Sequence, residues 1–537
     1  MIRGYSAQAV RDAEAPALAE GRPLMRNAAF ALATRTVALL RRHHIAVPGA
    51  RALVLVGGGN NGGDGLFAAA DLIDRGVQVR CVLAHERPHP EGLAAARRAG
   101  AQLVDLAGGV GAEDMSRLGQ WADVWVDALA GIGVQGALRG LPAQVVQALQ
   151  PIRSGSPVDP LVVAVDVPSG VGADPVRAAP PPPATGESET GPGGPGNHDE
   201  RAGGVLRADL TVTMGAPKTS LLIPPGVHHA GRVEVVDLGL GGSFAAQEST
   251  VHRLTPTDVA DLWPVPEPAD HKYTRGVVGL VAGSPRFPGA ALLCAAAALG
   301  VGVGMVRYLG RREVADAVIG AHPEVVPEDG RVQSLVIGPG MADDDDLAAA
   351  MRRALRGWGL GEEGPEDGDA AVAVVLDAGA LDHLPDAPAV LARKPVVLTP
   401  HAGELETLLR RFGDEVRREQ IEADPWTWAH RAARRTGTTV LLKGAITVIA
   451  PPDGGPGYSQ ADGTPWLATA GSGDALAGVL GAMFAQAHPG DVAAIAAAAV
   501  VVHGRAAHLA GGPLRSVDLA AAVPRAIADM LRTDPNR

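Results

Sequence analysis

Four polar side chains in the first half of the sequence stand at the ends of short apolar segments: Asn61, Asp127, Asp166 and Ser169. If these segments are strands of one parallel sheet, the four side chains converge at its carboxyl edge, where ligands bind in open α/β sheets. Each residue alone is better explained as a turn former or a helix N-cap. Their convergence from three segments favours a binding site instead.

A glycine-rich segment, GGGNNGGDG at residues 57–65, joins the first of these strands to a helix. Free backbone N–H groups at a helix N-terminus suit a phosphate ligand. The next strand ends in Val82, Leu83, Ala84 and His85, so no acidic residue is placed to bind a ribose. A standard NAD dehydrogenase is therefore a poorer fit.

The sharpest motif lies in the second half, at residues 470–478, AGSGDALAG. Small residues open a helix there, so its free N–H groups form an anion hole for a transferring phosphoryl group. Asp474 is placed to take a proton from a substrate hydroxyl. Alone, the motif would be a helix start with an aspartate in its first turn, but four other segments accompany it at strand ends: GSPRFPGA, GPG, TPHAGEL and KGAIT.

The first half alternates strand-like and helix-like segments. Valine-rich segments bounded by Gly or Pro predict strands at 51–56, 77–84, 122–127, 161–167, 208–215 and 232–240. Segments with helical spacing lie between them, as at 66–75 and 141–150. This alternation predicts a parallel sheet with helices on both faces. We expect a Rossmann-like, three-layer α/β sandwich.

The second half repeats this organisation. Strands are predicted at 277–282, 303–309, 334–338, 371–376, 395–399 and 439–449, with helical segments between most of them. Residues 473–531 are mostly helical in pattern. The uncharged segment 289–306 is rich in Ala and Gly and is interrupted by glycines at its end, which favours a helix, a turn and a strand over a membrane span. We expect a second α/β domain.

One segment interrupts the first domain. Residues 176–204 are rich in Pro, Gly and Glu and have almost no large apolar side chains, so burial cannot offset their ordering entropy. We predict a disordered insert inside a first domain of residues 1–240. Residues 241–270, which include a Pro-rich segment, are the expected linker to a second domain, 271–537.

The composition excludes several classes of protein. The net charge of −12 argues against nucleic-acid binding, which needs a basic patch. Charges interrupt the first twenty residues, so we expect no signal peptide and no membrane association. Cys81 and Cys294 stand outside any metal-ligand spacing, which indicates reduced, buried thiols in a cytoplasmic protein. The sequence leaves open whether the chain forms a homo-oligomer.

The segments GNNGGDG, VDALAGIG, DVPSG and ADLTVTMGAPK together resemble the NAD(P)HX epimerase domain, over residues 1–240. The resemblance implies interconversion of the R and S forms of hydrated NADH and NADPH. It implies potassium binding by Asn61, Asp127 and Ser169, whose oxygens suit a hard cation. It implies substrate contacts from Asn60, Asn61, Gly62, Gly63, Asp64, Gly131, Ile132, Gly133, Val134, Gln135, Gly136, Ala137 and Asp166.

Within that resemblance, we expect Asp166 to be the general acid or base, because a carboxylate there could relay a proton as the C6 hydroxyl leaves and returns. One position departs from the family. Where its early helix commonly reads LMExAG, this chain has Leu24, Met25 and then Arg26. No role for a glutamate at that position is therefore expected here.

The motif at 470–478 resembles the ribokinase-like superfamily, and the full set of segments resembles the ADP/ATP-dependent NAD(P)HX dehydratase over residues 270–531. The resemblance implies that the hydrated dinucleotide contacts Ala290, Gly340, His401 and Asp474. It implies that the adenine nucleotide contacts Lys443, Gly444, Ala445, Ile446, Thr447 and Gly473.

The implied reaction phosphorylates the C6 hydroxyl of the S form at the expense of ADP or ATP, and then eliminates phosphate, a better leaving group than hydroxide. Mg²⁺ is expected to bridge the phosphates. Asp377 and Glu404 are candidate ligands for it, whereas the acidic residues 343–346 indicate a solvated helix start. The sequence does not decide between ADP and ATP.

Two other functions stay open at this stage. A true small-molecule kinase would leave a stable phosphorylated product, whereas a dehydratase would release phosphate and restore the absorbance of NADH. A binding protein without catalytic activity is the other alternative. The presence together of Asp127, Asp166, Ser169 and Asp474 argues against it.

Overall fold

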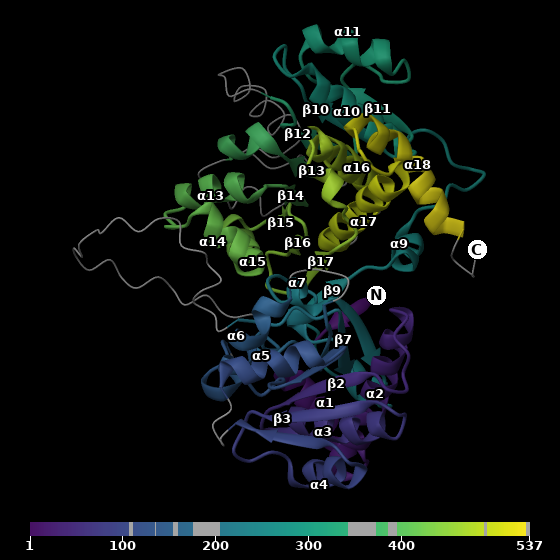
Figure 1. Ribbon diagram of the computed structural model, residues 1–537. Helices are drawn as coiled ribbons and strands as arrows, with labels where there is room; N and C mark the ends of the chain where they lie inside the picture. The colour runs from purple at the N-terminus through teal and green to yellow at the C-terminus, as the bar shows by residue number, and fades with distance from the viewer. Residues whose placement is uncertain are drawn as a thin grey trace, which may run out of the picture. The chain divides into compact units, whose positions relative to one another are not determined.

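The computed structural model describes residues 1–106, 111–134, 136–153, 159–174, 204–341, 372–384, 395–487 and 491–532. The predicted insert (apart from residue 204), Gln135 and residues 343–346 lie outside the described residues. The chain forms two compact units (Figure 1): an N-terminal unit, Arg3–Val251, and a C-terminal unit, His252–Arg537 with Met1–Ile2. The division falls inside the expected linker, which holds α8 (Gly241–Ala245), β9 (Val251–Arg253) and α9 (Pro256–Leu262).

The N-terminal unit contains a seven-stranded sheet in the order β4-β3-β2-β5-β6-β7-β8. Every neighbouring pair in it is parallel. The strands are β2 (Arg51–Val56), β3 (Gln78–Leu83), β4 (Gln102–Asp105), β5 (Val124–Ala128), β6 (Leu161–Val165), β7 (Leu210–Met214) and β8 (Arg232–Val236). Six of these strands were predicted, and β4, which is short and only partly buried, was not.

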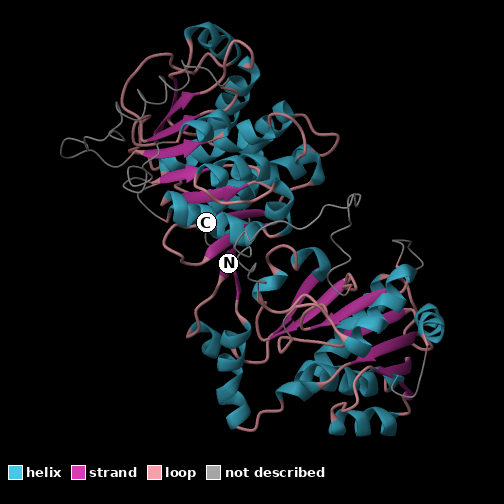
Figure 2. Ribbon diagram, turned by 90° about the vertical axis from the view of Figure 1, so that its left-hand side faces the viewer, coloured by secondary structure: helices cyan, strands magenta, loops and turns pink. Residues whose placement is uncertain are grey.

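Helices cover both faces of this sheet because successive strand residues point to opposite faces. One face is covered by α1 (Ala7–Ala19), α2 (Leu24–Arg42), α3 (Gly59–Ile73) and α4 (Pro90–Ala99), and the other face by α5 (Ala112–Trp121) and α6 (Gly140–Leu149). Val54 and Val56 of β2 belong to the core on the first face, whereas Leu53 and Leu55 belong to the core on the second face. A short α7 (Val227–Ala230) precedes β8. The predicted three-layer sandwich is confirmed (Figure 2).

Helix α3 begins earlier than predicted. The sequence pattern placed it at 66–75 after a glycine-rich loop, but the helix starts at Gly59 and includes most of that loop. An alanine at Gly62 would place its Cβ atom 2.2 Å from the carbonyl oxygen of Gly57. The glycines therefore allow the first turns of the helix to pack directly against the chain leaving β2, which hydrophobic periodicity cannot reveal.

The C-terminal unit is built on a ten-stranded sheet in the order β1-β9-β17-β16-β15-β14-β13-β12-β10-β11. Strands β10 to β15 form its parallel part. The strands are β1 (Ile2–Gly4), β10 (Val277–Val281), β11 (Met305–Tyr308), β12 (Ser334–Ile337), β13 (Ala373–Leu376), β14 (Val396–Leu398), β15 (Thr439–Leu442), β16 (Thr447–Ala450) and β17 (Gly457–Gln460).

The single strand predicted at 439–449 is wrong. Residues 443–446 form a turn, so the segment is an antiparallel hairpin of β15 and β16. The apolar pattern continues through the turn and conceals it, because only Lys443 and Gly444 interrupt it. The turn projects from the carboxyl end of β15, where the other predicted site segments also end.

One face of this sheet is covered by α10 (Pro288–Gly300), α16 (Ser472–Gln486), α17 (Val492–Ala510) and α18 (Ser516–Arg532), which share one apolar core. The remaining helices are α11 (Arg312–Ala321), α13 (Ala402–Arg411), α14 (Arg418–Ala423) and α15 (Pro425–Thr436). Residues 289–306 form α10, a turn and β11, as predicted. Among the described residues one helix, α17, is long and apolar enough to cross a membrane, but 72% of its apolar window is buried in the fold.

Candidate active sites

A cavity of about 970 Å³ opens in the N-terminal unit at the carboxyl ends of β2, β5 and β6. Nine of the predicted substrate-contact residues line it: Asn60, Asn61, Asp64, Gly131, Ile132, Gly133, Val134, Ala137 and Asp166. Gly62, Gly63 and Gly136 are not among its lining residues, and Gln135 lies outside the described residues. The structure thus brings together the side chains from three strand ends that the sequence analysis expected to converge.

Asp127 and Ser169 do not line this cavity, but Ser169 Oγ accepts a hydrogen bond from the N–H of Ala130, which does line it. The hydroxyl of Ser169 donates to Oδ1 of Asp127 at 2.6 Å, and the Ser169 N–H donates to Oδ2 at 2.9 Å. Both side chains are fully buried. Burial raises the pKa of Asp127, against the lowering effect of the hydrogen bonds from Ser169. The sheet thus holds a buried carboxylate that has no cationic side chain as its partner among the described residues.

Asn61 supplies the third predicted ligand of this group. Its side chain is buried, and its Nδ2 atom has no hydrogen-bond partner in the described part of the chain. Its Oδ1 atom lies 3.0 Å from where a Cβ atom on Gly131 would stand, so it faces the loop that lines the cavity. An amide oxygen, a carboxylate and a hydroxyl form a donor set that fits a hard cation. The described residues contain no cluster of three or more His, Cys, Asp or Glu that would suit a transition metal.

Asp166 follows β6 in a strained backbone conformation. Its φ angle is 67°, in the left-handed region that non-glycine residues rarely occupy and that is frequent at functional sites. Its Oδ1 atom accepts hydrogen bonds from Thr213 Oγ1 at 3.2 Å and Met214 N at 3.0 Å, and it forms an ion pair with Lys218. The other oxygen, Oδ2, makes no hydrogen bond within the described residues.

Lys218 was missed as a site residue by sequence reasoning. Its side chain is fully buried, and its ammonium also donates to Met214 O at 2.8 Å and Thr213 Oγ1 at 3.1 Å. The only available signal was a lysine four residues after a buried strand, at the end of the segment ADLTVTMGAPK. The buried ammonium holds Asp166 through its Oδ1 atom.

Two more carboxyl groups line the same cavity, those of Glu14 and Asp64. Burial raises the pKa of Glu14, and it raises the pKa of Asp64 well above its usual range, with the Asp166 carboxylate adding to the effect on Asp64. Sequence reasoning named Asp64 only as a substrate contact and did not find Glu14, which lies in the first helix, far from the motifs in sequence.

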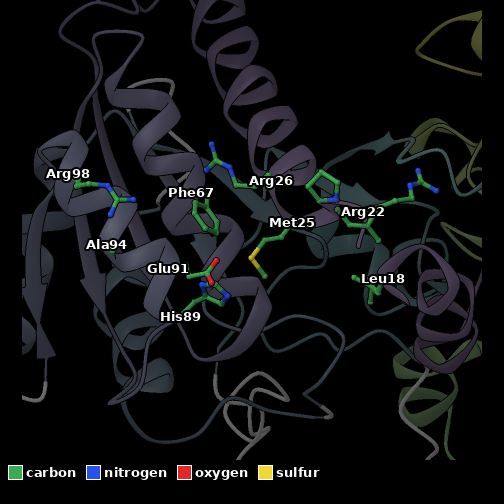
Figure 3. Close-up of a pocket in the computed structure, with 11 residues that line it drawn as sticks. Leu18, Arg22, Met25, Arg26, Phe67, His89, Glu91, Ala94 and Arg98 are labelled. Carbon is green, nitrogen blue, oxygen red and sulfur yellow. The ribbon is translucent and has the colours of Figure 1, made fainter. Parts of the chain in front are cut away.

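A second cavity of about 620 Å³ lies next to the first and shares Leu18, Leu24 and Met25 with it (Figure 3). Arg26 lines this second cavity, with its guanidinium 4.6 Å from the centre of the Phe67 ring and 3.9 Å from Asp71. The residue that departs from the family pattern therefore packs on an aromatic ring at the rim of the neighbouring cavity. It does not line the first cavity.

In the C-terminal unit, the predicted motif forms the start of α16. Gly471 has a φ of 88°, and Asp474 lies in the first turn of the helix. Burial, with the nearby Asp377 carboxylate, raises the pKa of Asp474 to about 6. His503, which sequence reasoning missed, is buried on α17 and holds the motif through a 2.9 Å hydrogen bond between its Nε2 atom and Ser472 O.

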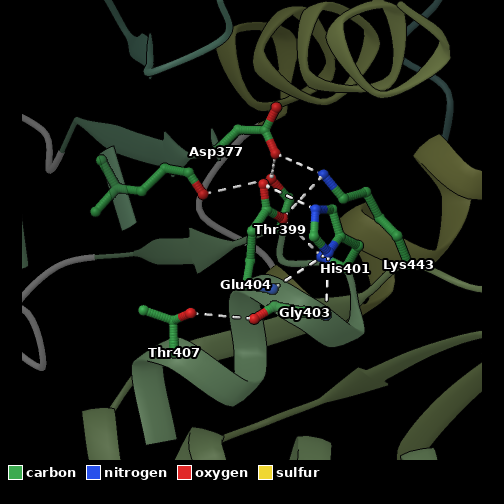
Figure 4. A network of polar contacts seen from close by, with 8 residues as sticks. Asp377, Thr399, His401, Gly403, Glu404, Thr407 and Lys443 are labelled. Atoms are coloured by element: carbon green, nitrogen blue, oxygen red, sulfur yellow. Dashed lines mark hydrogen bonds and ion pairs between the residues drawn. The ribbon is translucent and has the colours of Figure 1, made fainter. Parts of the chain in front are cut away.

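The ammonium of Lys443 lies 3.6 Å from where a Cβ atom on Gly473 would stand, at the start of this helix. Figure 4 shows the contacts of Lys443 with side chains at the neighbouring strand ends. Its ammonium donates to Asp377 Oδ1 at 2.8 Å and lies 3.7 Å from Glu404 Oε2. Thr399 Oγ1 donates to the same oxygen of Asp377 at 2.8 Å. Burial alone would lower the pKa of Lys443, but the carboxylates of Asp377 and Glu404 outweigh it and the pKa is raised. Asp377 and Glu404, the two candidate Mg²⁺ ligands, therefore both form ion pairs with Lys443 in this structure.

His401 caps α13 beside this network. Its Nδ1 atom accepts hydrogen bonds from the N–H groups of Gly403 and Glu404, at 3.1 and 3.2 Å, and its Nε2 atom, on an exposed ring, lies 3.5 Å from Glu404 Oε1. Its backbone pairs with that of Lys443. The predicted substrate contact His401 and the predicted nucleotide contact Lys443 are therefore adjacent.

Ala290 and Gly340 form another part of the site. Gly340 has a φ of 63°, and a Cβ atom on it would lie 2.3 Å from the Cβ of Ala290. A Cβ atom on Gly471 would meet Leu293 Cδ1 at 2.4 Å, and Leu293 lies in α10 with Ala290. Helix α10 thus connects these two residues to the motif of α16. In the turn after Lys443, Gly444 and Ala445 are exposed, and Thr447 is buried in β16.

Two family models match the chain, one in each unit. Residues 21–220 match the YjeF-related protein N-terminus, and residues 278–519 match the NAD(P)H-hydrate dehydratase model. Two α/β domains, each with charged side chains gathered at the carboxyl ends of its strands, define a two-site enzyme.

Relatives that align with almost the whole chain show the family to which it belongs. The bifunctional NAD(P)H-hydrate repair enzyme Nnr of Mycobacterium tuberculosis (strain CDC 1551 / Oshkosh) is 40% identical over 501 residues, 91% of this chain and 90% of its own. The Mycobacterium leprae enzyme of the same name is 37% identical over 94% of this chain and 93% of its own. This chain belongs to the family of bifunctional NAD(P)H-hydrate repair enzymes.

Among solved structures, the ADP/ATP-dependent NAD(P)H-hydrate dehydratase from Bacillus subtilis, co-crystallized with ATP/Mg²⁺, is 27% identical. The alignment covers 52% of this chain and 99% of that one, with a TM-score of 0.44.

Proposed function

We propose that the N-terminal unit interconverts the R and S forms of hydrated NADH and NADPH. The C-terminal unit then dehydrates the S form to NADH or NADPH, consuming ADP or ATP and releasing AMP or ADP with phosphate. Because a dehydratase of this kind acts on one epimer only, joining it to an epimerase lets one chain repair both.

The observation that carries the epimerase proposal is the single cavity lined by the start of α3, the loop at residues 131–137 and Asp166. In this proposal, the N–H groups at the start of α3 bind the pyrophosphate. Asp166, with Oδ1 fixed by three donors, presents Oδ2 to the hydrated nicotinamide ring and exchanges a proton with it.

Asn61, Asp127 and Ser169 would hold a potassium ion in the same unit. The support is the buried Asp127 carboxylate, which lacks a cationic side-chain partner in the described part of the chain, next to amide and hydroxyl oxygens. The ion would supply the missing positive charge. The residues themselves fix the position of the loop after β5 relative to the loop after β6.

The observation that carries the dehydratase proposal is the placement of Lys443 over the start of α16, beside Asp474. Asp474 would accept the proton of the C6 hydroxyl as it attacks the terminal phosphate, and the N–H groups of the Gly473 turn would bind the transferring group. Mg²⁺ would neutralise charge on the phosphates, and the carboxylates of Asp377 and Glu404, which lie beside Lys443, would hold it.

The decisive experiment incubates the full chain with mixed R and S epimers of NADHX plus ADP or ATP, followed by chromatography. We expect both epimers to disappear, with NADH and free phosphate appearing in equal amounts. A stable phosphorylated product would indicate a small-molecule kinase instead. Consumption of the S form alone would show that the N-terminal unit is not an epimerase.

A further inference from the structure

The Asp64 side chain is half-buried, and one of its carboxyl oxygens, Oδ1, is buried without a partner in the described part of the chain. It lies in the second turn of α3 and lines the large cavity of the N-terminal unit. Its Oδ1 atom is fully buried and accepts no hydrogen bond, and no ion pair to it exists among the described residues. A buried carboxylate with no partner costs several kcal/mol, so such a group binds a proton.

Two neighbouring carboxyl groups act on Asp64 in the same direction as burial. Asp166 and Glu14, which line the same cavity, both raise the pKa of Asp64, and burial is the largest cause. Lys218 is the one cation that opposes them, and its ammonium is committed to Asp166. Burial and the neighbouring carboxyl groups therefore hold the pKa of Asp64 well above its usual range, which favours the protonated form of Asp64.

The two carboxyl groups reach the cavity from different elements. Asp64 comes from the second turn of α3, which follows β2, whereas Asp166 follows β6, and β5 lies between β2 and β6 in the sheet. With strands about 4.8 Å apart, β2 and β6 are separated by about 10 Å. Because Asp64 and Asp166 line one cavity from these separate elements, a flat ring bound there can meet one carboxyl group at each of its faces.

We propose that Asp64 is the acid of the epimerase reaction and that Asp166 is its base. The Asp64 carboxyl gives its proton to the C6 hydroxyl, the C6–O bond breaks with its electron pair leaving on water, and the N1 lone pair forms a C6=N1 iminium. Water then adds to the other face: its oxygen bonds to C6, the π pair returns to N1, and Asp166 takes the released proton. The reverse reaction, or exchange with solvent, restores the original protonation of the pair.

Paired carboxyl groups with opposite protonation are how enzymes separate acid and base roles at one pH. The inference rests on the proposed epimerase activity and adds a second proton-transfer residue to it.

The simpler alternative is that Asp64 only donates a hydrogen bond to the dinucleotide. Glu14 is a third buried carboxyl in the cavity and is the competing candidate for the acid.

Asp64→Asn separates these possibilities, because an asparagine has the shape and donor capacity of the neutral acid but cannot release a proton. Purified R-NADHX is supplied to the full chain without ADP or ATP, so that the dehydratase site is idle, and formation of the S form is followed by chromatography. We expect kcat to fall by about 10²–10⁴-fold with KM unchanged. A binding role alone would leave kcat intact, and that result overturns the proposal.

Asp71→Asn is the matched control. Asp71 lies in the same helix, its Oδ2 atom is also buried without a partner, and burial raises its pKa, but it does not line the large cavity. This variant should keep the wild-type kcat. Glu14→Gln should retain most of the rate, and a loss equal to that of Asp64→Asn would reassign the acid to Glu14.

The pH profile of the wild-type chain gives a test that needs no variant. Because the acid must be protonated, kcat/KM should fall as the pH rises through the raised pKa of Asp64, and the residual activity of Asp64→Asn should lack this alkaline limb. An epimerase with no such limb overturns the acid role but leaves the proposed function intact. A chain that does not epimerise at all refutes both.

Discussion

The ammonium of Lys443 lies 3.6 Å from the position that a Cβ atom would occupy on Gly473. The same ammonium donates to Asp377 Oδ1 at 2.8 Å, so its place over the first turn of α16 is fixed. The ammonium of Lys443 and the free N–H groups at the start of α16 therefore lie close together. Such an arrangement stabilises a transferring phosphoryl group.

Asp474→Asn should abolish dehydration and leave epimerisation intact. Asp474 is the one carboxyl in the first turn of α16, and losing a general base costs about 10²–10⁴-fold in rate. NADH formation from the S form measures the first activity, and chromatography of the epimers measures the second. Asp518→Asn, at an exposed carboxyl of α18, is the control and should dehydrate normally. Near wild-type dehydration by the Asp474 variant would rule it out as the proton acceptor.

The dehydratase rate should depend on pH with a midpoint near the Asp474 pKa of about 6. A general base works only when ionised, so kcat/KM should rise as the pH increases through that value and then level off. The positive charge of Lys443 lowers the pKa of Asp474, so Lys443→Met should shift the midpoint of the residual activity to higher pH, besides reducing the rate. An unchanged midpoint in the variant would mean that another group titrates.

Asp127→Ala should remove potassium dependence and most of the epimerase activity. Asp127 is the only formal charge among the three proposed ligands, and its hydrogen bonds with Ser169 join the ends of β5 and β6. Misplacement of a catalytic group by about 1 Å can cost about 10²-fold in rate. The rate is titrated against potassium in both proteins, while dehydration of the S form serves as the internal control. Wild-type epimerisation that is indifferent to potassium would remove the case for the ion.

Arg26→Glu, which introduces the residue common in the family, should destabilise the N-terminal unit modestly. The substitution removes a cation stacked on Phe67, worth about 0.5–1 kcal/mol at an exposed site, and brings a carboxylate near Asp71. A loss of that size lowers Tm by about 1–4 °C in a unit of this length. Arg26→Gln, which loses the positive charge without adding repulsion, should have a Tm between those of the wild type and Arg26→Glu. A variant that melts at or above the wild-type temperature would show that the stack contributes nothing.

The sequence by itself determined the class of both units and most of their strands. Continuous Val- and Leu-rich segments such as 51–56 are buried on both faces of a parallel sheet, so composition and spacing identify them directly. Because the ends of parallel strands meet at one edge, the sequence also predicted that Asn61, Asp127, Asp166 and Ser169 would converge. The structure places Asn61 and Asp166 in the wall of one cavity, with Asp127 and Ser169 joined beside it.

Only the tertiary structure decided which charged groups face one another. Nothing local links Lys218 to Asp166, or Lys443 to Asp377 across 66 residues of sequence, because ion pairs between strand ends depend on strand order and on the register of the sheet. The same applies to Asp64, whose burial without a partner results from helix α3 beginning at Gly59 and packing against β2. Sequence spacing indicates which residues can reach the site. Their protonation depends on burial and on the charged groups around them, and both are fixed only when the chain folds.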